Sequence, residues 1–266
     1  MRTPFQGSAL EDVSRLIARG VLTPNLAIES PVTSNQFGNP VGVPGNLPQR
    51  DSLGAGFAAR PEIRQWRGKR AVDILLAVPL VIVLAPVVIL AAIAVWLEAP
   101  RSPVLFRQRR VGRGGREFWM LKFRSMQPDA EERLHAQEDL LERFYNGDHK
   151  IPDHLDPRIT WTGRFLRRSS IDELPQLFNV LAGHMSLVGP RPVERTQLGQ
   201  YQTRKLYYLA MRPGLTGLWQ VGGRSRVTFP LRAQLDELYA CRCSFLMDLR
   251  ILLRTPFAVL RGLNED

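Results

Sequence analysis

Residues 74–97 read ILLAVPLVIVLAPVVILAAIAVWL, an uninterrupted stretch without a charged side chain. As one straight α-helix this stretch would be about 36 Å long, and the hydrocarbon core of a bilayer is roughly 30 Å thick. It begins too far along the chain to be a signal peptide. A buried core helix is the alternative, but the length and the saturation with Val, Leu, Ile and Ala favour insertion into a membrane.

Basic residues flank this apolar stretch on both sides. They are Arg64, Arg67, Lys69 and Arg70 before it, and Arg101, Arg107, Arg109, Arg110 and Arg113 after it. Because Lys and Arg prefer the cytoplasmic side, a spanning helix would place one cluster on the wrong side. Pro79 and Pro86 each remove a backbone donor inside the stretch and favour a kink. We therefore predict a re-entrant helix-break-helix, and either proline could make the break.

The entry point into the membrane carries its own pattern of charge. Asp73 follows Lys69 and Arg70 by four and three residues, so the three side chains can pair on one helical face. Together with Pro79 and Pro86 they form the predicted membrane-entry set, held at the level of the lipid headgroups.

The rest of the chain predicts an α+β protein that is mainly helical. Residues 1–62 are rich in Gly, Pro, Asn and Ser and are predicted to be a largely disordered polar tail. Residues 63–100 form the membrane anchor, and residues 101–266 form a cytosolic domain. The net charge of +11 indicates an anionic partner: nucleic acid, a membrane surface or a phosphorylated substrate. Two cysteines are too few for a disulfide scaffold.

Several elements of the cytosolic domain can be placed from their patterns. Residues 103–111 and 117–126 flank a Gly-rich segment and predict a β-hairpin. Residues 129–145 predict a charged helix, and residues 162–182 are mostly helical. Residues 245–261 form an amphipathic pattern with arginines that can snorkel, which suits a helix in the membrane interface as well as one in the core.

The densest chemistry lies in residues 167–176, which read RRSSIDELPQ. Arginine suits bidentate phosphate contacts, so Arg167 beside Asp172 and Glu173 could hold a phosphate next to a carboxylate. Alternatively, Ser170 and Glu173 could form a capping box at the start of a helix, a purely structural role. If Pro175 instead opens the helix, both acids lie just outside it and can face a ligand. Spacing alone leaves both interpretations open.

Two Gly- and Pro-rich segments offer further candidates. Residues 189–192 read GPRP, which stiffens the backbone around Arg191. Residues 213–220 read PGLTGLWQ and are followed by Gly222-Gly223-Arg224, a flexible loop with an aromatic face and a cation. Ordinary turn chemistry explains both segments equally well.

Taken in order, these motifs resemble the bacterial sugar transferase family, the monotopic polyprenyl-phosphate hexose-1-phosphate transferases, which are phosphoglycosyl transferases. The resemblance extends from about Lys69 to the C-terminus. The matching segments are KRxxD at 69–73, RRVG at 109–112, LKFRSM at 121–126, DPRIT at 156–160, SIDELPQ at 170–176, VGPRP at 188–192 and PGLTGLWQV at 213–221.

The resemblance implies an enzyme of the bacterial inner membrane whose catalytic domain faces the cytoplasm. Its reaction transfers hexose 1-phosphate from a UDP-sugar to undecaprenyl phosphate, releases UMP and primes exopolysaccharide or other surface-glycan synthesis. Asp172 and Glu173 would be the catalytic pair, with Asp172 forming a covalent phosphosugar intermediate and Mg²⁺ held by Glu173 with Asp172. The phosphate-binding candidates are Arg167, Arg191 and Lys122, and the nucleotide or sugar loop candidates are Trp219, Gln220 and Arg224.

Two departures from the family pattern matter for specificity and organisation. Residues 1–62 contain no hydrophobic span, which predicts a short member with the catalytic module and a polar tail. Arg226 follows Arg224 where many members carry an acidic or Asn residue, which leaves the sugar open, with glucose or galactose favoured. We also expect a homodimer.

A membrane-anchored scaffold or basic binding protein without catalysis is the alternative function. It would explain the charge and the amphipathic C-terminal pattern, but it would not need the Asp172-Glu173 pair. We expect no nucleic acid, because aromatic residues are not interleaved with the cations as stacking readers require.

Overall fold

The computed structural model describes residues 63, 65–146, 151, 153, 155–223 and 227–262. The chain divides into two units, Met1–Glu62 and Ile63–Asp266, and the structure described below is that of the second. The predictions for residues 1–62, Arg64, Arg224 and Arg226 therefore lie outside the described residues. The helices are α2 (Lys69–Glu98), α3 (Ala130–Ala136), α4 (Glu138–Asn146), α5 (Trp161–Ser169), α6 (Gln176–Leu181), α7 (Lys205–Ala210), α8 (Leu218–Gly222), α9 (Leu231–Arg242) and α10 (Phe245–Gly262), with 3-10 helices η3 (Arg113–Gly115), η4 (Ile171–Glu173) and η5 (Gln197–Arg204).

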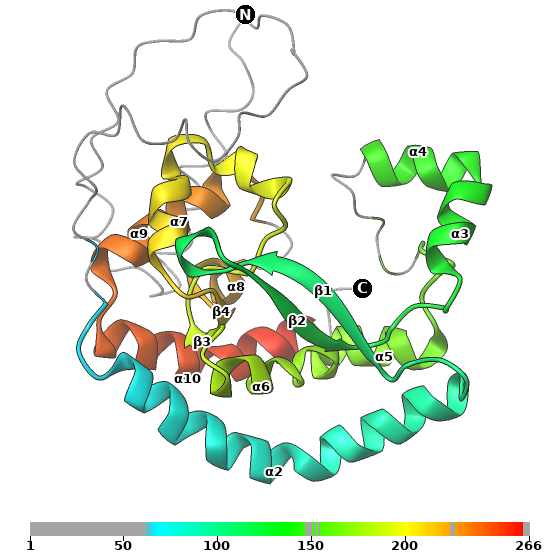
Figure 1. Ribbon diagram of the computed structural model, residues 1–266, viewed down its shortest axis with the longest axis horizontal. Helices are drawn as coiled ribbons and strands as arrows, with labels where there is room; N and C mark the ends of the chain where they lie inside the picture. The colour runs from blue at the N-terminus through cyan, green and yellow to red at the C-terminus, as the bar shows by residue number, and fades with distance from the viewer. Residues whose placement is uncertain are drawn as a thin grey trace, which may run out of the picture. The chain divides into compact units, whose positions relative to one another are not determined.

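Two small sheets accompany these helices and confirm a mainly helical α+β fold (Figure 1). Strands β1 (Leu105–Val111) and β2 (Glu117–Phe123) form the predicted antiparallel hairpin. Strands β3 (Ser186–Val188) and β4 (Gly214–Thr216) form a parallel pair that the sequence pattern did not predict. The charged segment predicted as one helix forms two, α3 and α4.

Helix α2 is continuous over 30 residues, with both prolines inside it. The predicted break is therefore wrong as an interruption, because each proline removes a single donor and the surrounding turns remain helical. The helix curves instead, as Figure 1 shows. Its buried residues fall in two groups, Lys69, Asp73 and Ala77 at one end and Ala91 and Val95 at the other. Between these two groups the helix is half-buried on one face, at Val81, Leu84, Ala85 and Val88, and exposed on the other.

Both ends of α2 are tied to the same domain. At the N-terminal end, Asp73 Oδ1 accepts from Ser186 Oγ and from the Leu187 backbone N–H at 3.0 Å each. Arg70 donates at 2.6 and 3.0 Å to the backbone carbonyls of Val180 and Leu181, the last residues of α6. At the C-terminal end, the Arg124 guanidinium donates to carbonyls of the last turn, Val95 at 2.8 Å and Ala99 at 3.3 Å.

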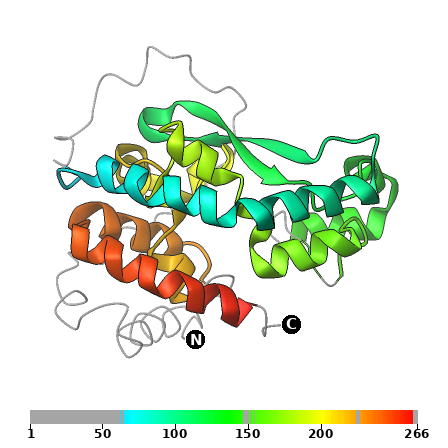
Figure 2. The ribbon, with the colours of Figure 1, turned by 90° about the horizontal axis from the view of Figure 1, so that it is seen from below.

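Helices α5, α6 and α10 lie with α2 in one layer beneath the hairpin, as Figures 1 and 2 show. Their outer faces expose large apolar side chains: Trp161, Phe165, Phe178, Leu246, Leu253 and Phe257. Helix α10 also has an inner face, where Ile251 and Asp248 are buried. The core interpretation of the C-terminal pattern is therefore confirmed for one face, while the interface interpretation stays a prediction for the other face, which is apolar and exposed. Among the described residues, only α2 is long and apolar enough to cross a membrane.

The Pro213–Gly217 segment is not the flexible loop that its composition predicts. Gly214 opens β4 and lies so close to Gly189 that a Cβ on it would stand 2.1 Å from the Gly189 backbone nitrogen. A Cβ on Gly189 would stand 2.4 Å from the Arg212 carbonyl oxygen. Glycine is needed here for close backbone approach, and the contact fixes the segment that carries Arg191.

Candidate active site

The acidic pair lies in a tight turn between two helices. Ser170 takes a left-handed conformation with φ 58° and ends α5, and residues 171–173 form the 3-10 helix η4. Pro175 is the N-cap of α6, and the Ser170 side chain makes no capping hydrogen bond. Of the two interpretations left open by spacing, the structure selects the one in which Pro175 opens the helix and the acids precede it.

Asp172 and Glu173 meet two cations from distant parts of the chain. Glu173 Oε1 accepts from Lys122 Nζ at 2.9 Å and from Arg191 Nη2 at 2.7 Å. Lys122 Nζ also lies 3.8 Å from Asp172 Oδ2, an ionic contact beyond hydrogen-bond distance. Strand β2 and the segment after β3 thus bring two of the predicted phosphate-binding residues, Lys122 and Arg191, to Glu173 of η4.

The two neighbouring carboxyls have opposite electrostatic character. Burial raises the pKa of Asp172 to about 6, although Lys122 opposes the rise. Burial also acts against ionisation of Glu173, but the nearby Arg191 and Lys122 outweigh it and hold the pKa of this carboxyl well below its usual range. In turn, Glu173 raises the pKa of Arg191. Glu173 is therefore a permanent anion, and Asp172 can gain or lose its charge near neutral pH.

Lys122 is held in place by an amide that the sequence reasoning missed. Asn179 of α6 donates from Nδ2 to the Trp119 carbonyl at 2.8 Å and accepts from the Leu121 N–H at 2.9 Å. These two bonds fix β2 against α6, next to η4. The DELPQLFN segment carries Asn179 seven residues after Asp172, and that proximity in sequence was the available signal.

Arg167 stands at the edge of the same site. Its guanidinium donates to Ser125 Oγ at 2.8 Å and to Asp153 Oδ1 at 3.0 Å, and its charge lowers the pKa of Asp172. The structure thus places Arg167 within electrostatic range of Asp172, with its hydrogen bonds directed to Ser125 and Asp153.

The loop candidates are only partly joined to the site. Trp219 is buried, and the Arg191 guanidinium carbon lies 6.0 Å from its ring centre, while that of Arg232 lies 4.7 Å away. The amide of Gln220 and the indole N–H of Trp219 are buried without a hydrogen-bond partner. Trp219 therefore packs beside a phosphate-binding candidate, and the third loop candidate, Arg224, lies outside the described residues.

Comparison of the sequence with known protein families shows to which family the chain belongs. The bacterial sugar transferase family matches residues 64–262, which include every element described above. The chain belongs to the bacterial sugar transferase family.

Relatives of this sugar transferase are known in several bacteria. It is 41% identical over 198 residues to the undecaprenyl-phosphate galactose phosphotransferase of Salmonella typhimurium, covering 73% of this chain and 40% of that protein. It is 44% identical over 195 residues to the UDP-glucose:undecaprenyl-phosphate glucose-1-phosphate transferase of Caulobacter vibrioides, covering 70% and 67%. It is 38% identical over 201 residues to the exopolysaccharide production protein ExoY of Sinorhizobium fredii, covering 72% and 84%. The chain thus spans about two fifths of the first of these relatives and most of the last.

The donor set of the sugar transferase site fits a magnesium ion shared with a substrate. No group of three or more His, Cys, Asp or Glu side chains gathers anywhere in the described part of the chain. Mg²⁺ is commonly held by one or two carboxylates together with substrate phosphates and water. Asp172 and Glu173, consecutive residues of η4, supply two carboxylates for that arrangement, whereas an all-protein cage would need more ligands.

The DPRIT motif of the family has a structural role that sequence reasoning did not assign. Asp156 and Arg158 form a buried two-nitrogen ion pair at 2.8 Å for each contact. Thr160 caps α5 by accepting from the Gly163 N–H at 2.9 Å, and its own N–H donates to the Ser125 carbonyl. The motif therefore starts the helix that leads into the acidic turn.

Proposed function

We propose that this sugar transferase moves hexose 1-phosphate from a UDP-sugar to undecaprenyl phosphate and releases UMP, as the priming step of exopolysaccharide or other surface-glycan synthesis. The observation that carries the proposal is the buried Asp172 beside Glu173, Lys122 and Arg191, in a domain tied to both ends of an apolar helix. The names of the relatives, which mention undecaprenyl phosphate with galactose or glucose, support the substrates.

The unequal charges assign different tasks to the two acids. Asp172 is not hydrogen-bonded to Lys122, so its ionised oxygen can attack the β-phosphorus of the UDP-sugar. A bond from Asp172 to phosphorus forms, the bond from that phosphorus to the bridging oxygen breaks, and UMP leaves. A phosphate oxygen of undecaprenyl phosphate then attacks the same phosphorus, and the Asp172 carboxylate is released.

Glu173 and the cations prepare the site for this double displacement. Lys122 and Arg191 share one oxygen of Glu173 and can turn toward the phosphates of an arriving diphosphate. Glu173, aided by Asp172, would hold Mg²⁺, which when bound neutralises the negative charge of the diphosphate. Arg167 would add positive charge beside Asp172.

We also propose that α2 enters and leaves the inner membrane by its cytoplasmic face. Lys69, Arg70 and Asp73 tie the first turns of the helix to the domain, and Arg124 ties its last turn to the same domain. The middle turns are apolar and exposed, as at Val83, which is 71% exposed. A curved helix that enters the membrane in this way would hold the site at the headgroup plane, where the acceptor phosphate lies, and would raise the effective concentration of the acceptor.

The test of the reaction is UMP release by the purified protein in lipid nanodiscs. UDP-glucose, UDP-galactose and UDP-N-acetylglucosamine are supplied separately with undecaprenyl phosphate and Mg²⁺. We expect UMP from UDP-glucose or UDP-galactose, dependent on Mg²⁺ and on the acceptor for repeated turnover. A protein that releases no UMP from any of the three would support the alternative, a membrane-anchored scaffold or basic binding protein.

The topology is tested with single cysteines on a background in which Cys241 and Cys243 are replaced by serine. Cysteines at the exposed positions Arg67 and Arg101 should both react with an impermeant maleimide in inside-out membrane vesicles. A cysteine at Val83 should stay unlabelled, since lipid surrounds it. If the cysteines at positions 67 and 101 are labelled from opposite sides of the membrane, α2 spans the bilayer. The expected homodimer is tested separately by the mass of the detergent-solubilised protein.

A further inference from the structure

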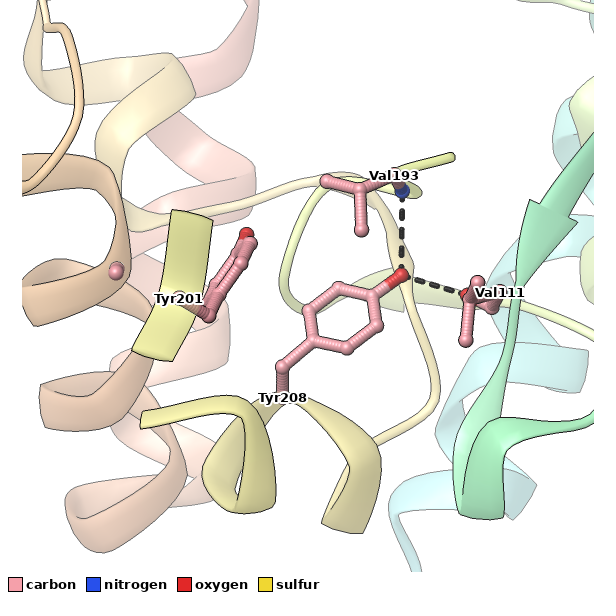
Figure 3. Packing of buried hydrophobic residues seen from close by; sticks show 5 residues of the cluster. Val111, Val193, Tyr201 and Tyr208 are labelled. Atoms are coloured by element: carbon pink, nitrogen blue, oxygen red, sulfur yellow. Dashed lines mark hydrogen bonds between the residues drawn. The ribbon is translucent and has the colours of Figure 1, made fainter. Parts of the chain in front are cut away.

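A tyrosine hydroxyl is inserted into the backbone pairing that holds the segment after Arg191. The Val111 N–H at the end of β1 donates directly to the Val193 carbonyl at 2.9 Å. In an antiparallel pair the return bond would run from the Val193 N–H to the Val111 carbonyl. Here the Val193 N–H instead donates to Tyr208 Oη at 3.2 Å, and the Tyr208 hydroxyl donates to the Val111 carbonyl at 2.6 Å (Figure 3).

The inserted hydroxyl sets the distance between the β1 end and the Arg191 segment. Val193 stands two residues after Arg191, with Pro192 between them limiting the backbone. On the other side of Arg191, the Gly189–Gly214 contact clamps the backbone. The guanidinium reaches Glu173 at 2.7 Å from a short segment held at both ends. A change at the Tyr208 clamp is therefore transmitted to the position of the Arg191 head group.

The surroundings of Tyr208 make its ring rigid. It is 1% exposed and packs against Tyr201, with ring centres 5.1 Å apart, in a buried cluster with Val111, Val193 and Ala233. The Tyr201 hydroxyl donates to Asp236 Oδ2 at 2.7 Å, so its hydrogen bond is made to α9. The cluster thus holds two buried tyrosines, of which one contacts the segment that carries Arg191.

We propose that Tyr208 is a positioning residue, whose hydroxyl places Arg191 for contact with the diphosphate of the UDP-sugar. The inference rests on the proposed function, in which Arg191 binds a substrate phosphate. Tyr208 itself contacts only the backbone of Val111 and Val193 through its hydroxyl, so it acts through Arg191.

The first test removes the side-chain hydroxyl of each of the two tyrosines, in separate variants. Tyr208→Phe should lower kcat/KM for the UDP-sugar about 10-fold or more, mainly through KM, because small displacements of a binding group are costly. Tyr201→Phe is the matched control, since it removes a hydroxyl of the same kind from the same cluster, and should change kcat/KM by less than about 2-fold. Equal losses in the two variants would overturn the proposal, since they would reflect general loosening of the cluster.

The second test asks whether the effect passes through Arg191. In an Arg191→Lys background, which keeps the charge but loses the guanidinium fork, Tyr208→Phe should cause little further loss, while Tyr201→Phe should act as it does in the wild type. A full and independent loss from Tyr208→Phe in this background would contradict the positioning role. If Tyr208→Phe does not fold, 4-aminophenylalanine at position 208, which keeps the ring and a donor toward Val111, replaces it in the same comparison.

Binding of UDP, followed by calorimetry on the same variants, separates this proposal from the reaction itself. A wild-type protein that releases no UMP overturns the proposed function. If UDP binding is still weakened by Tyr208→Phe about 10-fold, and only when Arg191 is present, the positioning role stands. If wild-type and Tyr208→Phe proteins bind UDP equally, it does not.

Discussion

Two buried carboxyl groups of this protein, Asp248 and Asp172, differ in how many hydrogen-bond donors contact them. Asp248 on α10 accepts from Lys69 Nζ at 2.7 Å, from the Trp66 indole N–H at 2.8 Å and from the Tyr239 hydroxyl at 2.7 Å. Asp172 is just as buried, yet its nearest cation, Lys122, stands 3.8 Å away and is engaged with Glu173.

The difference separates a carboxylate that holds the fold from one whose surroundings agree with the nucleophile role proposed above. Three donors satisfy Asp248, and they come from the start of α2, the chain before it and α9, so they lock α2 to the rest of the domain. Asp172 has burial without a matching set of hydrogen bonds, and its pKa of about 6 records that cost. Incompletely satisfied acids of this kind are concentrated at functional sites.

The largest effect should come from Asp172→Asn. Transfer should fall by about 10³-fold or more, because the amide cannot attack phosphorus. Stability should be kept, since the ionised form of Asp172 is disfavoured by burial. UMP release, radiolabelled sugar phosphate retained on the denatured protein and the melting temperature check this. Retention of label by the variant would remove Asp172 from the role of nucleophile.

Asp248→Asn should mainly lower the stability of the protein, in contrast to Asp172→Asn. Breaking the buried pair with Lys69 should cost about 3–5 kcal/mol of stability, because an unpaired charge is left inside. Thermal unfolding in detergent measures it. The exposed i,i+4 pair of Asp129 and Arg133 supplies the control, and Asp129→Asn should leave the melting temperature unchanged within error. Equal shifts in the two variants would contradict the structural role of Asp248.

A third buried acid, Asp236, should make the stability of the protein depend on pH. Burial raises its pKa to about 7, despite the hydrogen bond from Tyr201. The unfolded carboxyl releases its proton near pH 4, so the folded protein loses stability as pH rises from there through 7. Asp236→Asn should therefore be more stable than wild type at pH 8, with a difference that shrinks toward pH 4. A difference in melting temperature that does not change with pH would refute this linkage.

Lys122→Met should produce the smallest of these effects, a shift in the pH dependence of kcat/KM. Lys122 opposes the rise in the Asp172 pKa, so its loss should move the acid limb of the kcat/KM profile from near pH 6 upward by about one unit. Activity lost at pH 6 should be partly recovered at pH 8. Lys205→Met, a change outside the site, is the control, and its limb should stay in place. An unmoved limb in Lys122→Met would mean that another group sets it.

Much of the site could be predicted because its parts are close together in the sequence. Residues 167–176 place arginine, aspartate, glutamate and proline within ten positions, but spacing left two interpretations open, and the structure selected the one in which Pro175 opens the helix after the acids. The hairpin was likewise predicted from its two strands and the glycines between them. The β3–β4 pair was missed because strands of three residues are too short for an alternating pattern. The continuity of α2 was missed because proline patterns do not show how the neighbouring turns are supported.

The sequence by itself determined the apolar helix, the β-hairpin and the family, since each is recognised from short motifs whose residues are neighbours along the chain. Only the tertiary structure decided which cations meet Glu173, which asparagine fixes β2, and that Tyr208 stands between Val111 and Val193. These contacts join residues 15 to 97 positions apart. Such contacts form when packing brings distant segments together, and no local pattern of side chains encodes their geometry.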